Sequence, residues 1–183
     1  YTSGTTGLPK AAVISHRAQI ARMSALRLDL GIQPGDGYIS WAPMFHMGGT
    51  EHLISTLMSG ASGVVIDGFD ADAIIDALEA QPIGWLLLVP ATIAPLVARL
   101  KERRPTVKSV RAVGCMADLV PRTEIEEIST LLNAPFLNSF GATETGMPPL
   151  SGDLIRPGQD RDVLAKRLSI LTELRLVGPD GKD

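Results

Sequence analysis

The feature that most constrains the fold of this chain is an alternation of short apolar runs with longer segments of helical spacing. The runs "SGVVID" (62–67), "GWLLLVP" (84–90), "SVRAVGC" (109–115) and "PFLNSF" (135–140) have the length and composition of buried strands. Segments with helix start and stop signals lie between them. This order is typical of βα units, so we expect an α/β fold, a mostly parallel sheet flanked by helices.

Further segments complete the expected pattern. Two more strands are expected, at 11–14 and 36–43. Helices are expected at 16–30, 48–60, 70–81, 91–102 and 121–133. The tail differs in character, because "PPLSGDLIRPGQDRD" (148–162) is rich in Pro, Gly and Asp and indicates surface loop. Residues 172–183, "TELRLVGPDGKD", indicate a strand entering a turn.

Composition excludes several classes of protein. A net charge of −3 argues against a general nucleic-acid binder, and no apolar run approaches the length of a transmembrane segment. The single cysteine, Cys115, excludes an internal disulfide and suits a reducing cytoplasm, where we expect the protein to work. With 183 residues, 45% of them hydrophobic, the chain can bury one core, and we expect one domain over 1–183.

The opening stretch "YTSGTTGLPK" has the composition of a phosphate-binding loop. Gly4 and Gly7 permit backbone conformations that point successive N–H groups into one concavity. The hydroxyl groups of residues 2, 3, 5 and 6 (Thr2, Ser3, Thr5, Thr6) and the charge of Lys10 add donors without a compensating carboxylate, which suits a nucleotide triphosphate. The spacing differs from that of P-loop NTPases. By composition alone, a solvated turn remains an equal alternative.

A second informative stretch is "NSFGATETG", at the end of an expected buried strand. Ligands of open parallel sheets bind at the carboxyl ends of the strands. Phe140 offers an aromatic face, Gly141 permits close approach, Thr143 adds a hydroxyl and Glu144 a carboxylate. This set suits a purine ring beside a metal-bridged phosphate. The plain alternative is a strand and turn with an exposed glutamate.

Together the two stretches resemble the adenylate-forming superfamily, which includes acyl-CoA synthetases, luciferases and peptide-synthetase adenylation domains. Three further stretches agree with this resemblance in their order along the chain: "APMFHMGG", "VPATIAPLVARL" and "VGCMADLVP". The resemblance covers essentially the whole chain and is nearest to acyl-CoA ligases. It implies that the chain is an internal fragment of the large N-terminal domain of such an enzyme, because it lacks an initiating methionine and ends inside the expected turn.

The resemblance assigns roles to individual residues. The loop from Thr2 to Gly7 and Lys10 would contact the β- and γ-phosphates of ATP. Thr143 would meet the α-phosphate and Glu144 would bind Mg²⁺. His46 would lie beside the acyl carboxylate, so His46 and Glu144 are the expected catalytic residues. The expected nucleotide pocket comprises Asn138, Phe140, Gly141 and Ala142 besides Thr143, with Phe140 where the family more often has tyrosine. The expected acyl pocket comprises Gly114, Cys115 and Met116, the last two larger than is usual there. Candidates for lining an apolar pocket are Met44, Met47, Met116 and Met147.

The implied reaction uses ATP, Mg²⁺ and coenzyme A. A carboxylic acid attacks the α-phosphate of ATP to form an acyl-adenylate and pyrophosphate, and a thiol then displaces AMP. The family's ribose-binding aspartate, hinge and lysine-bearing C-terminal domain lie beyond Asp183, so we expect this chain alone to bind nucleotide weakly and to be inactive. We expect the acid to be fatty or otherwise apolar. The opening loop and the "NSFGATETG" turn should lie side by side.

Three alternatives remain open at this point. A peptide-synthetase adenylation domain would activate an amino acid, but it holds the substrate amine with an aspartate, for which Glu51 is a poor match. A non-catalytic nucleotide-binding module would keep the fold without the chemistry. An unrelated flavodoxin-like binding domain would account for the alternating pattern but not for the ordered motifs. Oligomeric state is not predicted.

Overall fold

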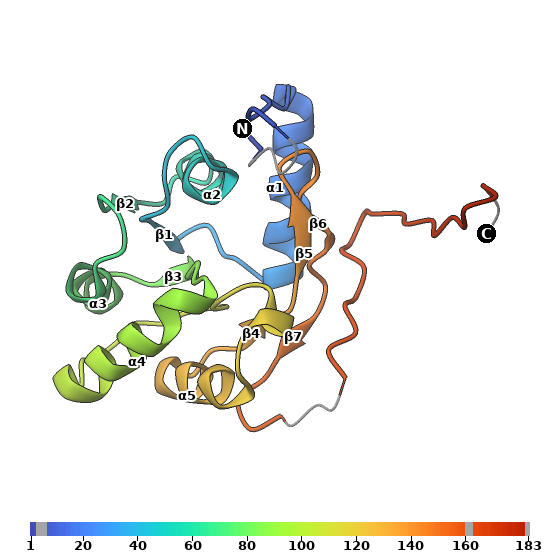
Figure 1. Ribbon diagram of the computed structural model, residues 1–183. Coiled ribbons are helices and arrows are strands. Elements are labelled where there is room, and N and C mark those ends of the chain that lie inside the picture. Colours follow the sequence, from blue (N-terminus) through green and yellow to red (C-terminus); the bar gives the residue numbers. More distant parts are fainter. Residues whose placement is uncertain (3–6, 160–162, 182–183) are drawn as a thin grey trace.

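The computed structural model describes residues 1–2, 7–159 and 163–181, and it has the expected α/β architecture. Its centre is a parallel sheet in the order β2-β1-β3 (Figure 1). These strands are β1 (Gly37–Ser40), β2 (Gly63–Val65) and β3 (Ile83–Trp85). The fold class predicted from the sequence is therefore confirmed.

The sheet continues beyond β3 through single bridges. Parallel bridges join Ile83 to Val110, Leu86 to Val113, and Val113 to Phe136. They lead to β4 (Phe136–Leu137), with which β7 (Leu154–Ile155) pairs in the antiparallel sense. The expected strand at 109–115 is thus present as bridges rather than as a regular ladder, and a positive φ of 73° at Gly114 turns the chain out of the sheet.

Helices cover both faces of the sheet. Figure 1 shows α3, α4 and α5 on one side and α1 and α2 on the other. Their bounds are α1 (His16–Leu30), α2 (Met47–Met58), α3 (Ala71–Ala80), α4 (Pro90–Arg103) and α5 (Arg122–Leu132), and a short 3₁₀ turn spans Ala117–Leu119. The limits of α1 match the prediction because Ser15 caps its start and Gly31, at φ 65°, ends it. No helix in the described residues is both long and apolar enough to cross a bilayer.

β1 and β3 are buried on both faces, and alternate side chains along them and in residues 86–88 enter two cores. Ile39, Leu86 and Leu88 belong to the core beneath α3, α4 and α5. Tyr38, Trp85 and Leu87 belong to the core beneath α1 and α2. This division follows from the period of two along a strand. It explains why "WLLLV" is a continuous apolar run rather than an alternating one.

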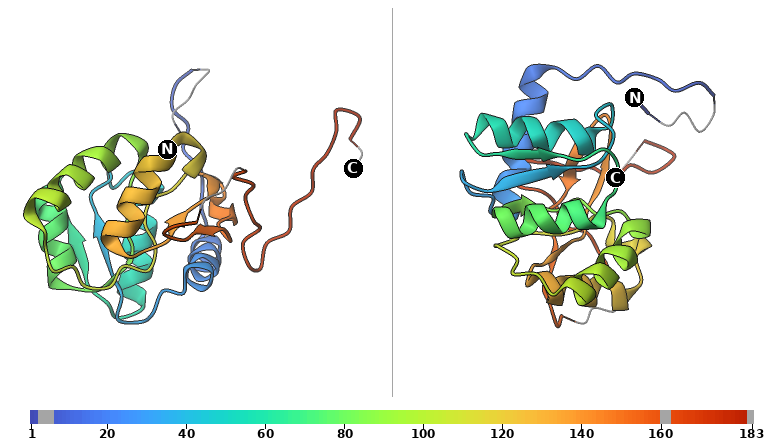
Figure 2. Two further views of the ribbon diagram at one scale, coloured as in Figure 1. Left: turned by 90° about the horizontal axis from the view of Figure 1, so that it is seen from below. Right: turned by 90° about the vertical axis from the view of Figure 1, so that its left-hand side faces the viewer.

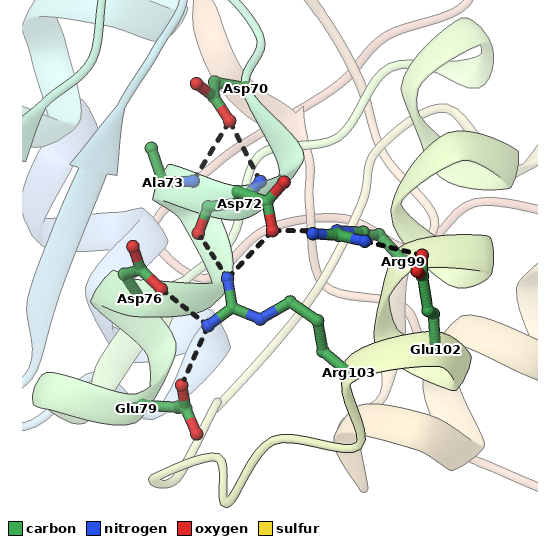
Figure 3. Close-up of polar contacts among 8 residues, drawn as sticks. All are labelled: Asp70, Asp72, Ala73, Asp76, Glu79, Arg99, Glu102 and Arg103. Carbon is green, nitrogen blue, oxygen red and sulfur yellow. Dashed lines mark hydrogen bonds and ion pairs between the residues drawn. The ribbon is translucent and has the colours of Figure 1, made fainter.

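A network of charged side chains links α3 to α4 on the surface of the molecule (Figure 3). The Arg103 guanidinium contacts Asp72 at 2.9 Å and Asp76 at 2.6 Å, and Arg99 contacts Asp72 at 2.8 Å. Hydrogen bonds from Arg99 and Arg103 hold the pKa of Asp72 below its usual range. Because these side chains are solvated, the network orients the two helices more than it stabilises them.

Three local predictions were wrong. Residues 11–14 form no strand, and the described part of 172–183 contains the expected turn but no strand. Part of the expected loop at 148–162 is instead strand. β5 (Phe140–Ala142) and β6 (Gly146–Leu150) form an antiparallel hairpin, and β7 follows it. The prolines of β6 indicated a loop, but a strand that pairs on one side only can accommodate them.

The close packing of Gly114 yields a stability prediction. A Cβ at Gly114 would lie 2.2 Å from a ring carbon of Phe136, which is fully buried. Gly31 has a similar positive φ, but a Cβ there would meet nothing within 4 Å. We expect Gly114→Ala to lower the free energy of unfolding by about 1–3 kcal/mol more than Gly31→Ala. Urea denaturation of the two variants measures this difference, and equal losses would show that the Phe136 ring can move aside.

Candidate active site

A cavity of about 470 Å³ lies where the parallel strands end. Four segments surround it: residues 41–48 after β1, residues 85–89 at the end of β3, residues 115–116 after the bridged segment, and residues 139–143 after β4. Carboxyl ends of parallel strands meet at one edge of a sheet, which is where ligands of such folds bind. Its walls comprise Trp41, Ala42, Pro43, His46, Met47, Gly48, His52, Trp85, Leu87, Val89, Cys115, Met116, Ser139, Gly141, Ala142, Thr143 and Met147.

The start of α2 is held against the end of β1 by polar contacts. The Tyr38 hydroxyl donates to the carbonyl of Gly48, and the Ser40 hydroxyl donates to the carbonyl of Gly49 at 2.7 Å. A Cβ at Gly49 would lie 2.5 Å from the carbonyl oxygen of Pro43, so only glycine permits this approach. The "MFHMGG" stretch is therefore shaped to present its histidine at a fixed place.

His46 is the N-cap of α2 and borders the cavity from its exposed side. Its Nδ1 accepts a hydrogen bond from the Gly48 N–H at 3.0 Å. In the neutral ring the proton must then sit on Nε2, which is left as a donor. The prediction that His46 belongs to the site agrees with this placement, and the geometry adds which nitrogen can donate.

Cys115 and Met116, which were expected in the acyl pocket, also border the cavity. The Cys115 thiol donates to the carbonyl of Leu88 at 3.3 Å, and burial raises its pKa to about 12. A thiol in this state is a structural group and not a nucleophile. Gly114, the third predicted residue, packs beneath Phe136 and does not border the cavity. Its carbonyl accepts from the indole N–H of Trp85 at 2.9 Å and so orients that ring.

The β5–β6 hairpin closes the cavity from the side of α1. Gly141, Ala142 and Thr143 border the cavity, in line with their predicted place in the site. Arg22 of α1 donates to the Thr143 carbonyl at 3.2 Å and pairs with Glu51 of α2, with both side chains 9% exposed. This pair fixes the hairpin against both helices. The sequence analysis missed the role of Arg22, because a charge within a helical pattern does not reveal its partner.

Other predicted residues lie outside the cavity walls. Asn138 is buried, donates to Asp153 at 2.9 Å and accepts from Lys166 at 2.8 Å, so it braces the end of β4. Phe140 is 54% exposed and Glu144 lies on the exposed turn of the hairpin. Of the four methionines, Met47, Met116 and Met147 border the cavity, whereas Met44 is half exposed and does not.

The opening loop can be placed only in part. Ser3, Gly4, Thr5 and Thr6 lie outside the described residues. The Thr2 N–H donates to the Lys10 carbonyl at 2.8 Å, and Gly7 and Lys10 are exposed. Figure 2 shows the described segment before α1 running away from the helical layers. The expected position of this loop beside residues 138–146 stays a prediction.

Three ring residues that the sequence analysis did not assign to the site, Trp41, Trp85 and His52, also border the cavity. The period of two along a strand places Trp85 and Leu87 on the same face. It does not predict that this face borders a cavity. No group of three side chains suited to hold a metal ion occurs among the described residues. Mg²⁺ commonly uses only one or two carboxylates together with substrate phosphates, and the single exposed carboxylate of Glu144 fits that mode.

Sequence comparison assigns the chain to a family. The profile of the AMP-binding enzyme family matches residues 1–183. Among curated proteins, the indoleacetate–CoA ligase of Aromatoleum aromaticum is 34% identical across 100% of this chain and 36% of its own length. The 4-chlorobenzoate–CoA ligase of a Pseudomonas species is 26% identical across 86% of this chain and 32% of its own length. The chain thus spans about a third of the length of these relatives.

Solved structures agree on the fold. The N-terminal domain of FACL13 from Mycobacterium tuberculosis superposes with a TM-score of 0.80 at 22% identity, over 99% of this chain and 45% of that one. MatB from Rhodopseudomonas palustris gives a TM-score of 0.75 at 26% identity, over 99% and 35%. The profile match over the whole length and the first relative lead to one conclusion. The chain belongs to the AMP-binding enzyme family.

Proposed function

We propose that the protein containing this chain is an ATP-dependent acid–thiol ligase that activates an apolar carboxylic acid and transfers it to coenzyme A. The observation that carries the proposal is the wall of the cavity. No Asp, Glu, Lys or Arg is among its described residues, and indole, imidazole, thioether and aliphatic groups form most of its surface. A cavity of about 470 Å³ with such walls suits a small apolar ligand with one polar end.

The wall also argues against an amino-acid substrate. A substrate amine needs a carboxylate, and the acidic side chain nearest in sequence to the "MFHMGG" stretch is Glu51. That side chain is paired with Arg22 and does not border the cavity. An ammonium group buried there would be unpaired, at considerable cost. The proposal therefore places the protein with the CoA ligases rather than with the peptide synthetases.

We propose that the substrate is an aromatic or otherwise apolar acid rather than a fatty acid. The curated relatives are named for indoleacetate, 4-chlorobenzoate and 2-succinylbenzoate. Each name describes an acid with an aromatic ring. The rings of Trp41 and Trp85 on the cavity wall offer flat apolar surface against which such a ring can pack. The sequence analysis expected a fatty or otherwise apolar acid, and the proposal now puts aromatic acids first.

The proposed chemistry joins two displacements. A carboxylate oxygen of the acid bonds to the α-phosphorus of ATP while the bond to pyrophosphate breaks. A thiol sulfur then bonds to the acyl carbon while the bond to AMP breaks. The Nε2–H of His46 is suited to orient the carboxylate, and the residues 141–143 to lie against the nucleotide. Mg²⁺ would neutralise phosphate charge with Glu144 as its protein ligand, and the opening loop would contact the terminal phosphates.

Acid-dependent exchange of pyrophosphate into ATP tests the proposed function directly. We expect the full-length protein to catalyse exchange with aromatic and aliphatic apolar acids and not with amino acids, because the described cavity wall carries no partner for an amine. Exchange confined to amino acids would replace the proposal with the peptide-synthetase alternative. A folded protein that binds ATP but shows no exchange with any acid would instead be a non-catalytic nucleotide-binding module.

The proposed contact of His46 with the substrate carboxylate can be tested separately from its role as a helix cap. Asparagine also caps helices well, but its shorter side chain would not reach a carboxylate placed for the imidazole. We expect His46→Asn to preserve the midpoint of thermal unfolding and to lower kcat/KM for the acid about 10- to 100-fold, the effect of one hydrogen bond to a charged group. An unchanged kcat/KM would remove His46 from the site.

The role of Glu144 is tested by its dependence on metal. Glu144 is exposed, so Glu144→Gln should leave stability unchanged. We expect it to reduce kcat on the order of 100-fold and to raise the Mg²⁺ concentration needed for half-maximal rate. Glu173→Gln, at another exposed glutamate, is the matched control and should behave as the parent protein. Identical Mg²⁺ titrations for the two variants would rule out metal binding by Glu144.

A further inference from the structure

The ring of His52 is a polar group of the cavity wall that has no part in the proposed chemistry. His52 lies in the second turn of α2, is 7% exposed and borders the cavity. Its ring centre is 4.3 Å from that of Trp85 and 5.4 Å from that of Tyr38. It is therefore held between aromatic rings in the apolar part of the cavity.

The His52 ring makes no hydrogen bond to another described residue, and its ring contacts are with Tyr38 and Trp85. Buried polar groups in native proteins are nearly always paired, so an unpaired one calls for a reason. Burial, with the charges of Arg22 and Arg27 as smaller causes, lowers the pKa of His52 to about 3. The ring is thus neutral at ordinary pH, with one nitrogen that donates and one that accepts.

The large cavity is the place where a substrate can meet this ring. His52 also borders a void of about 10 Å³ on its other side, with Ser55 and Thr56. That void has at most the size of one water molecule. The cavity of about 470 Å³, in contrast, has room for a one- or two-ring acid.

The two histidines border the same cavity from different environments. His46, the N-cap of α2, is exposed, whereas His52 within α2 is buried. One end of the acid is its carboxylate, which belongs with His46 on the exposed side.

We propose that His52 is a specificity-determining residue that hydrogen-bonds a polar atom on the ring of an aromatic acid, at the end opposite the carboxylate. The preferred substrates are then aromatic acids that carry a ring N–H or hydroxyl, and isosteric acids without that group bind less well. This inference rests on the proposed function for the identity of the cavity as an acid site.

Calorimetric titration of the full-length protein with matched acids tests the inference without requiring turnover. The first pair is indole-3-acetate and benzothiophene-3-acetate, which differ in the ring N–H. The second pair is 4-hydroxyphenylacetate and 4-methylphenylacetate. We expect the polar member of at least one pair to bind about tenfold more tightly, because its isostere leaves the buried ring of His52 unpaired.

Variants of His52 distinguish recognition from packing. His52→Phe should reduce the tenfold preference to near unity while the apolar acids keep their affinity, and His52→Gln, which retains a donor and an acceptor, should restore part of it. His16→Phe, the same replacement on the exposed first residue of α1, should change nothing. Equal affinities within both pairs, a preference that survives in His52→Phe, or no binding of any acid would overturn the inference.

The same acids used in pyrophosphate exchange separate this inference from the proposed function. Binding with the expected preference but without exchange would keep His52 as the recognition residue and reject the ligase activity. Exchange with every acid at equal kcat/KM would keep the ligase activity and reject the role of His52.

Discussion

The parallel pairing of four segments that are neighbours in the sheet is the constraint on which the cavity depends. β1, β3, the bridged segment around Val113, and β4 all run in one direction, so the residues that follow them emerge at one edge of the sheet. Those residues include His46, Cys115 and Thr143, which lie far apart in sequence and together border one cavity. Helices on both faces stabilise this arrangement, because the strands bury apolar side chains in two directions.

A second constraint is the buried pair of Arg22 and Glu51. It joins α1 to α2, and the same guanidinium binds the carbonyl of Thr143 on the hairpin. A buried ion pair need not add net stability, but the loss of either partner leaves a charge unpaired. The pair therefore serves to fix the hairpin over the cavity. Glu51 itself is not among the described residues that border the cavity.

The sequence predicted those features that have local causes. Ser15 and Gly31 mark the limits of α1 through capping geometry. Of the residues that the motifs singled out, His46, Cys115, Met116 and 141–143 border the cavity, and their roles there stay predictions. Features that depend on distant partners were missed. The hairpin of β5 and β6 was obscured by prolines that an edge strand tolerates, and the strand expected at 172–177 is absent. Trp85 and His52 border the cavity because of how β3 and α2 pack against the rest of the fold. Sequence periodicity does not predict that packing.

His46, at the N-cap of α2, and His52, within that helix, have different environments. His46 caps the helix at the solvent side, where its Nδ1 is occupied by Gly48 and a single donor remains. His52 lies against the rings of Tyr38 and Trp85, and burial lowers its pKa, so the ring is neutral at ordinary pH. A carboxylate suits the solvated end, because a charge there retains access to water and to a nucleotide. A neutral polar group suits the buried end, because a charge there would lose its hydration. Under the proposed function, the carboxylate of an aromatic acid would lie towards His46 and its polar ring atom towards His52.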